Sequence, residues 1–119
     1  SVERLLTMAD RARRADRAER ARTLYELALD LVPSDADALT GMGWAYIDLD
    51  KGAAATATFR RVLSRNERFS PAHMGLAEAY QLRGMKRDAL KHYQRYLDLV
   101  PNGPEAPVAR RMIERLNAK

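Results

Sequence analysis

The stretch SPAHMGLAEAYQLRGMKRDALKHYQRYLDLVPNG, residues 70–103, decides the fold. Small or apolar side chains recur in it at helical spacing in two groups, which predicts two amphipathic helices. Gly84 lies between the groups and marks a turn, and Pro101 ends the second helix. The groups are Leu76, Ala77 and Tyr80, and then Ala89, Tyr93 and Tyr96. One such hairpin cannot bury its apolar face alone, so it needs a neighbour of the same kind.

The same pattern occurs twice more upstream, each time displaced by about 34 residues. The first group corresponds to Met42, Gly43 and Tyr46, and then to Met8, Ala9 and Ala12. The second group corresponds to Ala55 and Phe59, and then to Ala21 and Tyr25. Pro101 matches Pro33, two periods earlier. A constant period over three copies predicts three helical hairpins, each covering an apolar face of the next.

This pattern resembles the tetratricopeptide repeat, with copies at residues 2–35, 36–69 and 70–103 and a capping helix at residues 104–119. The resemblance covers nearly the whole chain. It implies a single domain, 1–119, of the all-α class. The expected architecture is a right-handed superhelix, or α-solenoid, of three antiparallel helix hairpins plus the capping helix.

The last segment predicts an amphipathic helix with Val108, Ala109, Met112, Ile113 and Leu116 on one face. An open solenoid needs such a cap for solubility, so we expect the array to end here. At the other end, Ser1 lies almost on the start of the first helix, and we expect nothing in front of that helix to cap it. We therefore expect the chain to be cut from a longer protein.

Composition excludes several classes of site. The chain has 119 residues, 46% of them hydrophobic and 31% charged, which is typical of a soluble helical protein. No apolar run approaches the ~18 residues that span a bilayer, and no stretch has the pattern of a signal peptide. There is no Cys, so disulfides and thiol chemistry are excluded. Arg outnumbers Lys, which favours a GC-rich, bacterial source, while the compartment stays open with the cytoplasm favoured.

A basic run surrounds the first predicted turn and comprises Arg11, Arg13, Arg14, Arg17, Arg20 and Arg22. Such a run can bind phosphate backbones, or it can be a solvated edge. Acidic partners stand four residues away in three pairs: Asp10–Arg14, Asp16–Arg20 and Arg22–Glu26. No aromatic side chains are interleaved for base stacking. The solvated edge is the preferred interpretation, and we do not expect nucleic acid as a partner.

No motif in the chain predicts a metal, a cofactor or catalysis. Asp48, Asp50 and Gly52 hint at a calcium loop, but the Gly and Glu required later in that loop are absent. His73 falls at a core position, and His92 is expected on the outer side of its helix. These two histidines alone cannot hold a metal ion. We therefore expect neither cofactor nor metal, and no enzyme.

The resemblance also implies a binding site, because the first helix of each tetratricopeptide repeat lines a concave groove. The family positions that face the groove correspond to Leu6, Asp10, Arg13 and Arg14, to Thr40, Trp44, Ile47 and Asp48, and to Met74, Glu78 and Gln81. Trp44 stands where the family commonly has Asn. It is expected to be an exposed anchor, with packing against its own scaffold as the alternative.

Some family members bind the C-terminal carboxylates of chaperone tails with a Lys and Asn clamp. Leu6, Asp10, Thr40 and Trp44 occupy the corresponding positions here, so we do not expect that ligand. The predicted groove is mixed to acidic around an apolar centre. It would suit a peptide or helix of another protein with apolar anchors and some basic residues. Two alternatives stay open: self-assembly of copies through the groove, and binding of a polyanion.

Overall fold

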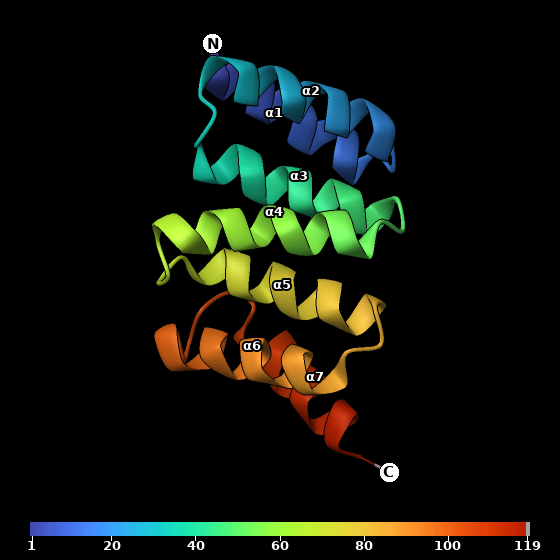
Figure 1. Cartoon of the computed structure of the whole chain (residues 1–119), viewed down its shortest axis with the longest axis vertical. Helices are drawn as coiled ribbons and strands as arrows, with labels where there is room; N and C mark the ends of the chain where they lie inside the picture. Colours follow the sequence, from blue (N-terminus) through green and yellow to red (C-terminus); the bar gives the residue numbers. More distant parts are fainter. Residues whose placement is uncertain (119) are drawn as a thin grey trace.

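The computed structural model describes residues 1–118, and these form seven α-helices without any strand (Figure 1). The helices are α1 (Val2–Arg14), α2 (Ala18–Leu31), α3 (Ala36–Asp48), α4 (Gly52–Arg65), α5 (Ser70–Leu82), α6 (Lys86–Leu99) and α7 (Ala106–Asn117). Each helix packs against the next, and α3 also contacts both α1 and α5. The hairpins are stacked from the N-terminus to the C-terminus in a body of 45 × 25 × 22 Å. The prediction of an all-α solenoid is confirmed.

One backbone feature recurs in every hairpin. The turn between its two helices contains a residue with positive φ: 62° at Asp16, 59° at Asp50 and 72° at Gly84. These residues are about 34 positions apart, so the three turns are built alike. Gly adopts this left-handed region readily, and Asp is among the few other residues that tolerate it. The sequence pattern predicted three hairpins, but only Gly84 signalled the positive φ of its turn.

Polar side chains and prolines fix where several helices begin. The Ser1 hydroxyl accepts a hydrogen bond from the backbone N–H of Arg4 at 3.3 Å, so the expectation that nothing caps the first helix was wrong. Asp35 caps α3 by accepting from the N–H of Ala38 at 2.9 Å. Pro71 lies in the first turn of α5, where its missing N–H is not needed. Local chemistry therefore sets these ends independently of the core.

Aromatic rings on the second helix of each hairpin form the centre of the core. Tyr25 on α2, Phe59 on α4 and Tyr93 on α6 occupy equivalent positions and are buried. Tyr80 on α5 is also buried, as the apolar spacing predicted. A core residue of this size contributes on the order of 3–5 kcal/mol when compared with Ala. The rings thus supply a large part of the packing between hairpins.

Two of these rings are in close contact with glycines of the following hairpin. A methyl group on Gly41 would overlap the Tyr25 ring, and one on Gly75 would overlap the Phe59 ring. Phe59 meets Gly43 of α3 in the same way, so its ring is held between α3 and α5. Only Gly leaves this space, so Gly43 lets the Phe59 ring of α4 lie directly against α3. The close approach sets the spacing of α3 and α5.

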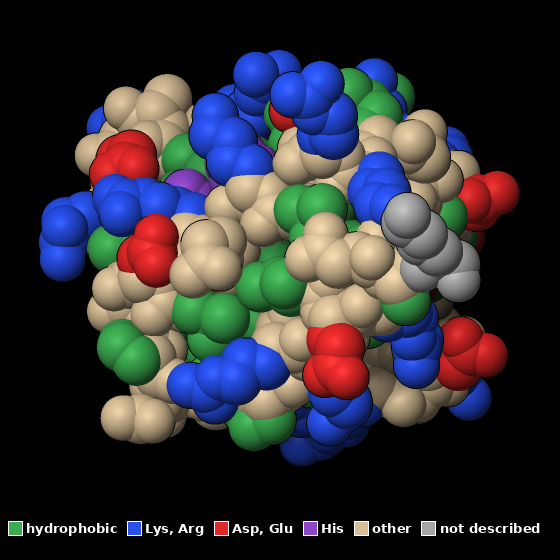
Figure 2. All heavy atoms as spheres, turned by 90° about the horizontal axis from the view of Figure 1, so that it is seen from below, with side chains coloured by type: hydrophobic (Ala, Val, Ile, Leu, Met, Phe, Trp, Pro, Cys, Tyr) green, Lys and Arg blue, Asp and Glu red, His purple; other side chains and the backbone are tan. Residues whose placement is uncertain are grey.

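Helix α7 packs against α6 and covers the C-terminal hairpin. Ala106 and Ala109 are buried at this contact, and the Tyr96 hydroxyl accepts from the N–H of Glu105 at 2.9 Å just before α7 begins. Figure 2, viewed from the end at which the chain finishes, shows Lys and Arg side chains around the edge of this face. Smaller hydrophobic areas lie near its middle. The cap therefore buries part of the apolar surface of α6 and presents a mostly polar outer face.

Gly75→Ala tests the ring–glycine contact. We expect it to lower the free energy of unfolding by about 1–3 kcal/mol, because the new methyl group overpacks the Phe59 ring. Urea unfolding followed by circular dichroism measures the change. The double variant Gly75→Ala with Phe59→Leu should lose less than the sum of the single losses, because the smaller side chain makes room. Equal stability of Gly75→Ala and the wild type would show that the contact is not tight.

Candidate functional site

Three adjoining hollows run along one face of the molecule and are lined mainly by α1, α3 and α5. The N-terminal hollow, of about 420 Å³, lies between α1 and α3 and includes Leu6, Asp10, Arg13, Arg14 and Thr40. The middle hollow, of about 350 Å³, is lined by Arg13, Trp44, Pro71, Met74, Glu78 and Glu105. The C-terminal hollow, of about 380 Å³, includes Ile47, Met74, Glu78, Gln81 and Met112. Trp44 borders all three, so they form one continuous groove.

The structure gathers the residues that the sequence assigned to the groove. Leu6, Asp10, Arg13, Arg14 and Thr40 meet at one end of it. Ile47, Met74, Glu78 and Gln81 meet at the other, with Trp44 between the two sets. Asp48 is the exception, because it is exposed and lines none of the three hollows. Its charge nevertheless raises the pKa of Glu78, which lines the C-terminal hollow.

Trp44 combines the two roles that the sequence left as alternatives. Its ring packs edge-on against the Phe59 ring, with centroids 5.6 Å apart and an angle of 74° between the planes. The side chain is only partly buried and forms a wall of the groove. The Arg13 guanidinium lies 6.0 Å from its ring centroid, within the range of a cation–π contact. Packing against the scaffold therefore holds Trp44 in place while part of its surface stays open.

The carboxylates near the C-terminal hollow act on one another. Loss of water around Glu78 raises the pKa of its carboxyl, and the charges of Asp48 and Glu105 raise it further, against an opposing effect of Arg13. Loss of part of the surrounding water raises the pKa of Asp48, against an opposing effect of Arg13, and the charge of Asp16 adds to the rise. No ion pair within residues 1–118 neutralises Glu78, Asp48 or Glu105. The lining of this end of the groove therefore carries a net negative charge, which Arg13 opposes from the middle hollow.

The N-terminal hollow has a different polar chemistry. The Asp10 carboxylate accepts a hydrogen bond from the Tyr25 hydroxyl, whose pKa is raised by burial and then by this carboxylate. Thr40 Oγ1 and Arg13 Nε are buried and have no hydrogen-bond partner among the described residues. A buried polar group without a partner costs about 1–3 kcal/mol. Both atoms lie below the surface, so a ligand in this hollow meets the charged groups of its lining, such as Asp10 and Arg14.

The pairing expected along the basic run was only partly right. Arg22 Nε lies 3.7 Å from Glu26, as predicted. Asp10 is instead committed to Tyr25, and Asp16 lies in the turn with positive φ, so neither takes part in an ion pair within residues 1–118. The helical spacing that suggested the Asp16–Arg20 pair does not hold, because Asp16 lies in the turn before α2.

Sequence reasoning missed one wall of the groove. Val108 and Met112 of α7, together with Glu105 just before it, close the C-terminal hollow. The resemblance assigned groove residues only to first helices of repeats, so it did not consider the capping helix. Pro71 and Leu82 also line the groove. Both residues lie in the first helix of the third repeat, so the register that assigned the other groove residues could have identified them too.

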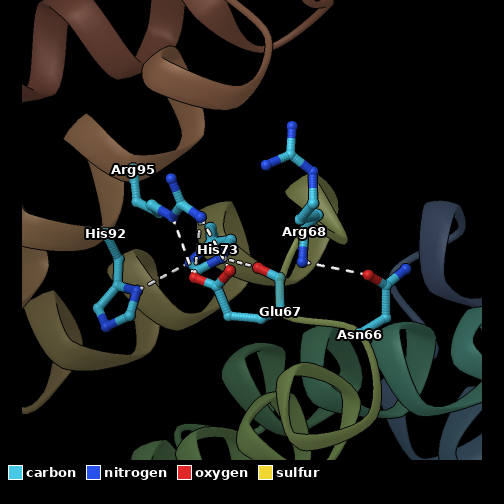
Figure 3. Close-up of polar contacts among 6 residues, drawn as sticks. All are labelled: Asn66, Glu67, Arg68, His73, His92 and Arg95. Carbon is cyan, nitrogen blue, oxygen red and sulfur yellow. Dashed lines mark hydrogen bonds and ion pairs between the residues drawn. The ribbon is translucent and has the colours of Figure 1, made fainter.

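A second polar cluster lies at the α4–α5 turn, and none of its residues lines the three hollows (Figure 3). His73 Nε2 donates to the carbonyl of Glu67 at 2.8 Å, so its Nδ1 accepts from Nδ1–H of His92 at 3.0 Å. Arg95 donates to both oxygens of the Glu67 carboxylate at 2.8 and 2.9 Å. His73 is buried, as predicted, but the expectation that His92 points outward was wrong, because its ring stacks on that of His73. This network ties the turn to α6.

Both histidines of this cluster are held neutral. Burial lowers the pKa of His73. Burial, and then the neighbouring His73, lower the pKa of His92 to about 4. No group of three or more potential metal-ligating side chains occurs within residues 1–118. The cluster is therefore best described as a structural hydrogen-bond network.

Among the described residues, none of the helices has the length and apolar character of a membrane span.

The neutral histidines make stability depend on pH. Between pH 6.5 and about 4, the unfolded chain binds a proton on His92 that the folded chain does not bind. The contribution of neutral His92 to the free energy of unfolding is therefore fully present above pH 6.5 and should fall as the pH is lowered through this window. In His92→Gln the slope should be shallower by up to about 1.4 kcal/mol per pH unit. Urea unfolding at a series of pH values measures both slopes, and identical slopes would contradict this account.

The fluorescence of Trp44, the only Trp, tests its exposure. We expect acrylamide to quench it readily in the free protein, because part of the ring borders the open groove. The chain unfolded in urea gives the reference for complete access. An emission maximum typical of a buried indole, together with little quenching, would show that Trp44 belongs to the core alone.

Comparisons with known proteins agree with the fold. The family model for the tetratricopeptide repeat matches residues 3–109. A search of curated proteins found no match. The first TPR domain of human RPAP3 superposes with a TM-score of 0.87 at 23% identity, over 97% of this chain and 91% of that chain.

Two further solved structures contain peptides. The first TPR of Spaghetti, bound to an HSP90 peptide, has a TM-score of 0.84 at 23% identity, over 98% of this chain and 94% of that one. The type III secretion chaperone SycD of Yersinia enterocolitica was solved in complex with a peptide of the translocator YopD. It has a TM-score of 0.85 at 17% identity, over 96% of this chain and 90% of that chain. At these identities the likeness concerns the fold. Taken with the family match, it shows that the chain belongs to the tetratricopeptide repeat family.

Proposed function

We propose that this chain is a protein–protein interaction module that holds a peptide or helix of a partner protein in its groove. The observation that carries the proposal is the continuity of the three hollows, which share Trp44 along the face lined by α1, α3 and α5. A long open groove suits an extended segment of chain better than a compact small molecule. Trp is also enriched among the residues that dominate binding energy at protein interfaces.

The chemistry of the groove supports a peptide ligand. Met74 and Ile47 supply apolar surface beside Trp44. At the other end, Asp10, Arg13 and Arg14 supply charged and hydrogen-bonding groups to the lining. A peptide has both kinds of group, since its side chains can fill the apolar part while its backbone pairs with the polar part. Neither His73 nor His92 lines the groove, so we propose binding rather than catalysis as its role.

The structural neighbours give further support. Spaghetti was solved with an HSP90 peptide and SycD with a peptide of YopD, so this fold holds peptides in proteins of similar architecture. The residues of this groove argue for a different peptide from that of the chaperone-tail class. Leu6, Asp10, Thr40 and Trp44 stand at the positions where that class carries its Lys and Asn clamp. We therefore propose a ligand recognised through apolar contacts around Trp44.

Trp44→Ala tests the proposed function. Peptides are first selected on the wild-type protein from a library of random linear peptides, and their affinities are measured by fluorescence anisotropy. We expect Trp44→Ala to weaken binding by about 2 kcal/mol, or roughly 30-fold, because it removes the central apolar wall. Leu27→Ala, on the exposed part of α2 outside the groove, is the matched control and should bind like the wild type. Unchanged affinity in a folded Trp44→Ala would overturn the proposal.

A further inference from the structure

We propose that the C-terminal hollow is a specificity pocket for a single lysine or arginine side chain of the partner segment. The inference rests on the proposed function, since it assigns one side chain of the bound segment to one part of the groove. Its basis is the combination of an apolar lining with unpaired carboxylates at a single opening.

The lining suits the aliphatic stem of such a side chain. Trp44 and Ile47 of α3, Met74 of α5, and Val108 and Met112 of α7 form apolar walls on several sides. The cavity of about 380 Å³ lies at the lower end of the range for ligand pockets, which fits one long side chain rather than a large group. Long basic side chains bury their methylene stems against apolar surface and keep the charged end in a polar environment.

The charges around the hollow suit the basic end of the side chain. Glu78 and Glu105 line the hollow, and Asp48 lies close enough to raise the pKa of Glu78. None of the three takes part in an ion pair within residues 1–118. Carboxylates accept hydrogen bonds, and ammonium or guanidinium groups donate them, so a cation placed here satisfies several acceptors at once. An acidic side chain would instead meet repulsion from all three.

The chain already contains an example of this kind of contact. The Arg13 guanidinium lies over the Trp44 ring, which shows that the environment of this ring accepts a cation. Arg13 lines the middle and N-terminal hollows but not the C-terminal one, so the C-terminal hollow has no basic residue of its own in its lining. A purely apolar anchor could fill the walls, but it would leave the charge of the carboxylates opposed by Arg13 alone. The basic side chain satisfies both features.

The test uses peptides selected on the wild-type protein and the double variant Glu78→Gln with Glu105→Gln. We expect the selected peptides to share a Lys or Arg next to a bulky apolar residue. The double variant should bind them about tenfold more weakly, because the substitution keeps shape and removes charge. A peptide with norleucine in place of the basic residue should bind the wild type and the double variant equally. Glu19→Gln, which makes the same change at an exposed position of α2 that lines none of the three hollows, is the matched control and should not alter affinity.

The outcomes separate this inference from the proposed function. Two results would overturn the pocket and leave the groove proposal intact. One is that the selected peptides need Trp44 but carry no basic residue. The other is that they bind the double variant as tightly as the wild type while the variant keeps its wild-type helicity. Failure of every peptide to bind in a Trp44-dependent way would overturn both. Light scattering of the free protein adds a third readout. A dimer that dissociates as peptide binds would identify a second copy as the occupant and overturn the assignment to a partner protein.

Discussion

The contact between an aromatic ring and a glycine of the next hairpin is the constraint on which the rest of the structure depends. Phe59 is held between Gly43 and Gly75, and Tyr25 of the first hairpin meets Gly41 of the second. Because no side chain intervenes, the first helices approach closely and form one inner face. The same Phe59 ring supports the edge of Trp44. The position of the groove's central residue therefore follows from the packing of the core.

Much of the fold could be predicted because a 34-residue period carries more information than any single position. The rings and the Gly84 turn were visible in the spacing of apolar and small residues. The positive φ at Asp16 and Asp50 was not visible, because Asp does not signal this conformation as Gly does. The cap at Ser1 was missed because a single Ser at a chain end carries no periodic pattern.

Less of the site could be predicted, and the reason is physical. The family register assigned Glu78 and its neighbours to one face, but it held no information on which chain end would close that face. The wall from Val108 and Met112 depends on how α7 lies on α6, which is a tertiary property. The stacking of His92 on His73 likewise depends on the contact of two helices rather than on the pattern of either.

The central claim is that partners bind in the groove that Trp44 connects. The most direct test is nuclear magnetic resonance of the ¹⁵N-labelled protein titrated with a selected peptide. The account predicts that the largest chemical-shift changes occur at the Trp44 indole N–H and along α3, α5 and α7, with α2 and the outer surface of α4 nearly unchanged. Changes concentrated on α2 and α4, with the indole signal unmoved, would contradict it.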